Sequence, residues 1–172
     1  MLCALVLASL LFYCYMGYLN SNLANDLRNA KYRGLAEIEL GAINTALANY
    51  ALAHHDEYPD SFQALFLAGG VNVKFFVNPL RAETPPLGPT TQAIADQLVS
   101  GGHLSYVYLG RGLTRKTATP NTVVAYELLS APNDGTSVLL GDGQVKYVDP
   151  AVIQKIIGQA NAGVFPVTMP SN

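Results

Sequence analysis

The first nineteen residues of the chain form an almost unbroken hydrophobic run. Residues Met1 to Leu19 read MLCALVLASLLFYCYMGYL, and no charged residue occurs before Asp26. An α-helix of about 20 residues, rising ~1.5 Å per residue, crosses the ~30 Å hydrocarbon core of a bilayer. The run therefore predicts a helix that lies in a membrane or in an equally apolar environment.

Three interpretations of this run compete. A secretory signal peptide carries a basic segment before its apolar core, whereas the first basic residue here is Arg28. A plain signal anchor is the second interpretation. The third is the N-terminal helix of a filament subunit, which leaves the membrane to enter a bundle of its own copies. The rest of the chain decides among them.

The pattern continues as an amphipathic helix to about His54, and an unbroken helix of that length would measure about 80 Å. Gly17 and the asparagines of residues 20–25 are poor helix formers, so we expect the helix to weaken there. From Asp26 onward, apolar residues recur with a period near 3.6. The buried face is predicted to hold Leu35, Ile38, Ala42, Ile43, Ala46, Leu47 and Tyr50, with Arg28, Lys31, Glu37, Glu39 and Asn49 mostly elsewhere around the helix.

The helix is predicted to end in the segment His54-His55-Asp56-Glu57-Tyr58-Pro59, because proline disfavours helical backbone in the residue before it. The segment is either a metal or acid–base cluster or a solvated helix end. Adjacent residues of a helix point about 100° apart, and the HExxH spacing that places two histidines on one face is absent. We favour the solvated helix end.

The second half of the chain predicts short helices and a small antiparallel sheet. Helices are expected over residues 61–67, 91–100 and 149–157, and strands over residues 104–109, 122–128, 137–140 and 144–148. Asp142-Gly143 between the last two strands is a strong signal for a tight turn with positive φ at both central residues. The predicted fold class is α+β, with the long helix packed on this sheet.

The chain has 172 residues, enough for one apolar helix and one globular domain. We place the apolar helix in residues 1–25 and the globular domain in residues 26–172. The domain is divided into an amphipathic helix (26–55), loops and short helices (56–103), the sheet (104–148), and a C-terminal helix with a tail (149–172).

Charge and cysteine content narrow the function. Ten Lys and Arg balance twelve Asp and Glu, and no basic block exceeds Arg115-Lys116, so nucleic acid is not an expected partner. Cys3 and Cys14 are about 16 Å apart along one helix, too far for a disulfide within it. The sequence offers no evident nucleophile, cofactor loop or metal-binding motif, and His103 stands alone, so we do not expect an enzyme.

The order of these elements resembles type IV pilins and the pseudopilins of type II secretion. An apolar helix runs into an amphipathic one, ends in LAHHDEYP (52–59), and is followed by a small sheet. The segments SYVYLG (105–110), VVAYE (123–127) and VLLGDGQVKYV (138–148) look like the C-terminal half of planctomycete prepilin-like proteins. That group typically ends in a histidine, nine residues, and then Asp-Gly.

The chain departs from this pattern at two positions. Pro132 occupies the place of the histidine, so any role that the family gives that residue is missing here. Pilins usually carry glutamate at the fifth residue of the mature chain, and if Met1 is the mature start, that residue is Leu5. Either a leader was removed before residue 1, or this chain is inserted without such processing.

The resemblance implies a structural subunit of an extracellular pilus-like or pseudopilus filament that assembles through its apolar helix. The expected partners are further copies of the chain, the inner membrane before assembly, and the assembly machinery. A membrane-anchored enzyme or solute-binding protein is the alternative. Adhesion, motility, secretion and DNA uptake share this fold, so the resemblance implies an architecture and not a role. The expected interface residues are Leu2, Leu5, Val6, Leu10, Leu11, Phe12, Tyr15, Leu19, Phe165 and Met169.

Two further expectations concern the C-terminal half. Pseudopilins often hold calcium near the corresponding loop, so Asp134 and Asp142, with Asn133, are candidate ligands, and no other cofactor is expected. The alternative is that they are ordinary turn residues. The tail after residue 158 shows no periodicity, and it either docks on its own domain or lies across a neighbour. Because Phe165 and Met169 are apolar, we expect the tail to bridge neighbouring subunits.

Overall fold

The computed structural model describes residues 2–81, 83–100, 102–129 and 134–171. Within the first helix, the described side chains begin at Met16 and leave out residues 22, 25, 26, 28 and 29. The chain divides into two compact units, Met1–Gly34 and Leu35–Asn172. The sequence placed the boundary earlier, at residue 26.

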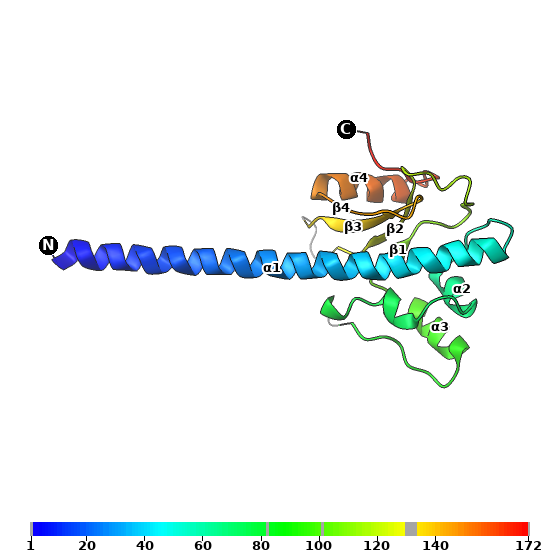
Figure 1. Ribbon diagram of the computed structural model, residues 1–172, viewed down its shortest axis with the longest axis horizontal. Coiled ribbons are helices and arrows are strands. Elements are labelled where there is room, and N and C mark those ends of the chain that lie inside the picture. Colours follow the sequence, from blue (N-terminus) through cyan, green and yellow to red (C-terminus); the bar gives the residue numbers. More distant parts are fainter. Residues whose placement is uncertain (1, 82, 101, 130–133, 172) are drawn as a thin grey trace. The chain divides into compact units, whose positions relative to one another are not determined.

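One long helix, α1 (Leu2–Ala53), accounts for the N-terminal third of the chain (Figure 1). It passes through residues 17–25 without a break, so the expected weakening there is wrong for the subunit. Each poor helix former costs about 0.5–1 kcal/mol, and a helix that is already propagating on both sides tolerates such penalties. Ser21 additionally donates a hydrogen bond to the carbonyl oxygen of Tyr18 at 2.8 Å.

The helix ends where the sequence predicts. His55 and Asp56 adopt positive φ angles of 55° and 68°, which turn the chain out of the helical path. The amide of Asp56 donates to the carbonyl oxygen of Ala51 at 2.9 Å and so closes the last turn. The chain then enters α2 (Phe62–Leu67), whose N-cap is Ser61.

Four strands form one antiparallel sheet in the order β1-β2-β3-β4. This confirms the α+β fold class, and every strand overlaps its predicted range. The strands are β1 (Tyr106–Tyr108), β2 (Val123–Glu127), β3 (Thr136–Leu140) and β4 (Val145–Val148).

The turn between β3 and β4 differs from the two-residue type that we expected. Gly143 has a φ of 87°, but Asp142 is not among the residues with positive φ. The amide of Gly143 donates to the carbonyl oxygen of Leu140 at 2.9 Å, as in a three-residue loop that ends in a left-handed glycine. A Cβ atom on Gly143 would lie 2.6 Å from Nδ2 of Asn44, so the turn packs closely on α1, and the positive φ disfavours a larger residue there.

Both faces of the sheet are covered within the second unit (Figure 1). Residues 35–53 of α1 pack on one face together with α2, α3 (Thr91–Ser100) and the 3₁₀ helix η1 (Val73–Phe76). Helix α4 (Pro150–Asn161) packs on the other. Neighbouring residues of β3 alternate between the two cores, because Leu139 faces α1 while Val138 and Leu140 face α4.

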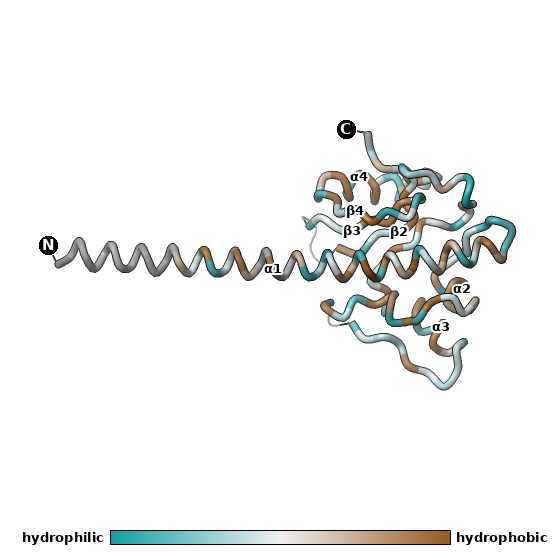
Figure 2. Tube along the Cα trace, in the orientation of Figure 1, coloured by the Kyte–Doolittle hydropathy of each residue, from teal (hydrophilic) through white to brown (hydrophobic). Residues whose placement is uncertain are grey.

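The buried face of α1 is rotated relative to the predicted one. Ile38, which we expected in the core, is 64% exposed, whereas Glu39 is only 4% exposed. Figure 2 shows hydrophobic and hydrophilic residues interspersed along this part of α1. The buried residues of this face are Ala36, Glu39, Leu40, Ile43, Ala46, Leu47 and Ala51.

The C-terminal tail docks on its own domain. The amide of Val123 donates to the carbonyl oxygen of Val167 at 2.9 Å, and the amide of Met169 donates to that of Asn121 at 2.8 Å. The Val167 side chain is buried, and Met169 packs against the core beside α4. Met169 is thus held by its own domain and Phe165 is exposed, and a contact of the tail with neighbouring subunits stays a prediction.

Candidate functional site

The described part of the first unit exposes a series of large apolar side chains on α1. These side chains are between 40% and 64% exposed, and they belong to Met16, Tyr18, Leu19, Leu23 and Leu27. Single exposed apolar residues are common on soluble proteins, but so many within twelve residues of one helix are typical of an interaction surface.

The other interface residues predicted on this helix lie before Met16, and their side chains fall outside the described residues. Of the predicted set, Leu19 is the α1 residue whose exposure is described. Among the described residues, no helix has the length and apolar character of a membrane span.

A largely buried polar cluster links α1, the loop of residues 78–83 and the sheet in the second unit. It contains three carboxylates and one guanidinium group. Its members are Glu39 of α1; Asn78, Arg81 and Glu83 in and around the 3₁₀ helix η2 (Pro79–Arg81); Ser105, directly before β1; Tyr106 of β1; and Glu127 of β2.

Tyr106 connects this cluster to α1. Its hydroxyl group donates a hydrogen bond to Oε2 of Glu39, and both side chains are buried. The two residues are 67 positions apart in the chain, so they meet only after α1 has packed on the sheet.

Asn78 connects the loop to the sheet. Its side-chain Nδ2 donates to Oε1 of Glu127 at 2.7 Å, and its backbone N–H donates to Oγ of Ser105, also at 2.7 Å. The Ser105 hydroxyl donates in turn to Oε2 of Glu83. This arrangement satisfies the polar groups of a fully buried asparagine.

Arg81 supplies the positive charge of the cluster. Its guanidinium group donates to the carbonyl oxygens of Leu128 and Leu129, the latter at 3.2 Å. Its Nε lies 3.6 Å from Oε1 of Glu83. The guanidinium group is thus directed toward the end of β2 and toward Glu83.

Burial raises the pKa of the Glu39 and Glu127 carboxyl groups. Desolvation, with a smaller contribution from repulsion by Glu127, raises the pKa of Glu39 to about 7, although the hydrogen bond from Tyr106 acts in the opposite direction. Desolvation also raises the pKa of Glu127, against the effects of Asn78 and Arg81. Near neutral pH the cluster can therefore hold or release a proton, but Glu39 is covered, so a substrate could reach it only if the packing opened.

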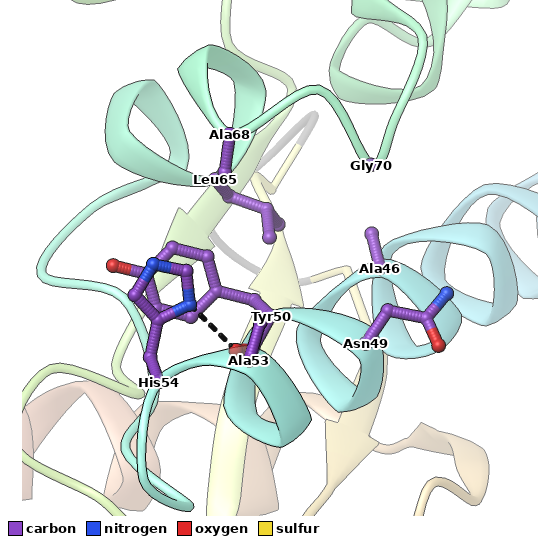
Figure 3. A pocket seen from close by; sticks show the side chains of 8 residues that line it. All are labelled: Ala46, Asn49, Tyr50, Ala53, His54, Leu65, Ala68 and Gly70. Atoms are coloured by element: carbon purple, nitrogen blue, oxygen red, sulfur yellow. Dashed lines mark hydrogen bonds between the residues drawn. The ribbon is translucent and has the colours of Figure 1, made fainter.

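A small pocket opens beside the C-terminal end of α1 (Figure 3). Its volume is about 110 Å³, well below the ~300 Å³ at which small-molecule sites usually begin. Tyr50 and His54 stack at its rim with ring centroids 3.8 Å apart, and Leu65 faces them from α2. The pocket therefore offers no specific support for a solute-binding protein.

His54, at the end of α1, has a structural partner. Nδ1 of His54 lies 2.7 Å from the carbonyl oxygen of Tyr50, one turn earlier in the helix. Asp56 forms an ion pair with Arg115 at 3.3 Å. Among the described residues, no three His, Cys, Asp or Glu side chains are grouped as a metal site would need. His103 lies apart from these, with its Nδ1 2.9 Å from the carbonyl oxygen of Thr84.

The structure does not bring the predicted calcium ligands together. Asp134 precedes β3 and Asp142 follows it, so the five-residue strand separates them by more than about 13 Å. Calcium binds oxygen atoms at about 2.3–2.6 Å, so two carboxylates at opposite ends of this strand do not fit a single calcium site. Oδ1 of Asp142 accepts a hydrogen bond from the amide of Gln144 at 3.0 Å, as a turn residue does. Asn133 and Pro132 lie outside the described residues.

Sequence reasoning missed the buried polar cluster. The sequence pattern placed Glu39 away from the buried face of the helix. Leu40, Ile43 and Leu47 nevertheless define a core stripe, and Glu39 lies next to Leu40 and one turn before Ile43. That spacing was a usable signal. Nothing in the local sequence Asn78-Pro79 indicates the pairing of Asn78 with Glu127, 49 residues later.

Comparison of the chain with models of protein families, with curated proteins and with solved structures finds no match in any of the three. The functional conclusion therefore depends on the sequence and geometry of the chain.

Proposed function

We propose that this protein is a structural subunit of a helical filament of the type IV pilus or pseudopilus kind. The observation that carries the proposal is α1, one continuous helix of 52 residues that begins with a charge-free apolar run. The apolar side chains of α1 that are described between Met16 and Leu27 are exposed in the single subunit. Copies of the chain would bury this surface by packing their helices side by side.

The energetics favour such association. Removing apolar surface from water stabilises a complex by about 25 cal/mol per Å², or ~1.5–3 kcal/mol for each large side chain that becomes fully buried. An array with a repeated head-to-tail operator buries the same helix surface in every copy and does not close on itself. In this proposal the subunit resides in the inner membrane before assembly, and a dedicated machinery then incorporates it into an extracellular filament.

The α+β architecture of the second unit supports the same assignment. Residues 35–53 of α1 pack on a four-stranded antiparallel sheet, as the resemblance to pilins implies. Helices cover both faces of this sheet, so the apolar surface that the described chain exposes comes from helices, loops and isolated strand residues.

A charge placed in the apolar run tests the proposal. The full chain is purified in detergent, the detergent is diluted, and pelleting at high speed measures assembly. Wild type is expected to pellet, whereas Leu10→Asp stays in the supernatant because an unpaired carboxylate cannot be buried among apolar helices. Leu87→Asp is the matched control, since Leu87 is 84% exposed in a loop of the second unit.

Two results would overturn the assignment. One is a wild-type chain that stays monomeric after the detergent is diluted. The other is a Leu10→Asp variant that pellets as the wild type does. The melting temperature of the second unit is measured in parallel, and it should be the same in all three proteins.

A further inference from the structure

We propose that the contact between Glu39 and Tyr106 is a pH-sensitive switch: while Glu39 carries a proton, α1 stays packed on the sheet from Leu35 onward, and loss of that proton detaches the turns around Glu39. This inference does not depend on self-assembly. It concerns only the second unit.

The position of Glu39 is the first part of the argument. The second unit begins at Leu35, so Glu39 lies about one turn inside the part of α1 that packs on the sheet. Its neighbours Ala36 and Leu40 are fully buried. A destabilised Glu39 therefore acts on the first turns of the packed segment.

The groups that face Glu39 are the second part. From β1 it meets the Tyr106 hydroxyl group, and from β2 the nearby charge is that of Glu127. Arg81 and Glu83 belong to the same cluster, but the guanidinium group of Arg81 is directed toward Glu83 and toward the carbonyl oxygens at the end of β2. A charged Glu39 is thus opposed by burial and by a second carboxylate, while the neutral Tyr106 hydroxyl group donates a hydrogen bond to it.

The sign of the effect follows from proton binding. The pKa of Glu39 rises from 4.5 when exposed to about 7 when packed. The packed state therefore binds the proton more tightly, so its stability is complete below pH 4.5 and is lost as the pH rises through 7. For this single proton, the equilibrium constant for opening is roughly 20-fold larger at pH 7.5 than at pH 5.5.

Hydrogen exchange of the full chain in detergent micelles measures this opening directly. Peptides covering residues 35–43 are followed by mass spectrometry at pH 5.5 and 7.5, and rates are corrected for the intrinsic effect of pH on exchange. Wild type is expected to lose protection by roughly 20-fold at the higher pH. Glu39→Gln keeps an acceptor for Tyr106 and is expected to show no such change. Glu37→Gln, at an exposed position of the same helix, is the matched control and should behave as wild type.

Two further variants test the role of the neighbours even if Glu39→Gln folds poorly. The pH midpoint of the loss of protection follows the pKa of Glu39 in the packed state. Glu127→Gln removes the repelling charge and is expected to lower this midpoint. Tyr106→Phe removes the donor to the carboxylate and is expected to raise it. A wild-type chain whose protection is independent of pH would overturn the proposal. So would midpoints that do not move in these directions, because a purely structural role would leave them in place.

Discussion

At the scale of single residues, the second unit depends on a few polar side chains that are buried with their partners. Asn78 shows this most clearly, because its side chain donates to Glu127 at 2.7 Å and accepts from the amide of Leu80 at 2.9 Å. An amide group can do both at once, whereas a carboxylate can only accept and an ammonium group can only donate.

Replacing Asn78 by alanine is expected to destabilise the second unit by about 2–4 kcal/mol, because Glu127 and the Leu80 amide lose their partners in a buried place. Urea unfolding at pH 6 measures the loss. Asn72→Ala is the control, since the exposed side chain of Asn72 accepts from the backbone amide of Lys74, and a loss of about 0.5–1 kcal/mol is expected there. Equal losses in the two variants would show that the Asn78 contacts contribute little.

These polar pairings were beyond sequence reasoning for a physical reason. Whether a glutamate on a helix is buried depends on what packs against it, and the partner of Glu39 lies on a strand formed 67 residues later. Ile38 and Glu39 point about 100° apart on the helix, so the orientation of the helix about its axis decides which of them enters the core.

At the scale of elements, local signals were sufficient for most of the fold. Ser61 caps α2 by accepting the amide of Ala64 at 3.1 Å, and Pro150 occupies the first turn of α4. Such signals act within a few residues and are readable in the sequence. The tail carries no comparable signal, because Val167 is held by a backbone hydrogen bond to β2 and by packing near α4.

The tail is therefore expected to contribute to the stability of the subunit itself. Val167→Ala removes buried methyl groups and should cost about 1–3 kcal/mol in urea unfolding. Phe165→Ala, two positions earlier and 57% exposed, should change stability by less than about 0.5 kcal/mol. If Val167→Ala instead leaves stability unchanged and reduces pelleting, the tail serves the assembly and not its own core.

At the scale of the whole molecule, the stability of the two units depends on self-association to different degrees. The second unit has its own core on both faces of the sheet, and the described part of the first unit is a helix that exposes Met16, Tyr18, Leu19, Leu23 and Leu27. Folding of the second unit should therefore need no partner, whereas the apolar run gains stability only when it is covered.

A chain truncated to residues 30–172 tests this separation. It is expected to fold without detergent, because it retains every residue of the two cores, and to sediment as a monomer. Sedimentation velocity and circular dichroism provide the readout. Aggregation or loss of structure in the truncated chain would mean that residues 1–29 contribute to folding of the second unit.

Electron microscopy of the assembled full-length protein tests the central claim most directly. After detergent removal, we expect helical filaments whose reconstruction places the α1 residues from Leu2 to Leu19 in a continuous apolar centre, with the sheet and its loops outside. Single subunits in micelles, or irregular aggregates with no helical order, would contradict the assignment to a filament and favour a membrane-anchored protein.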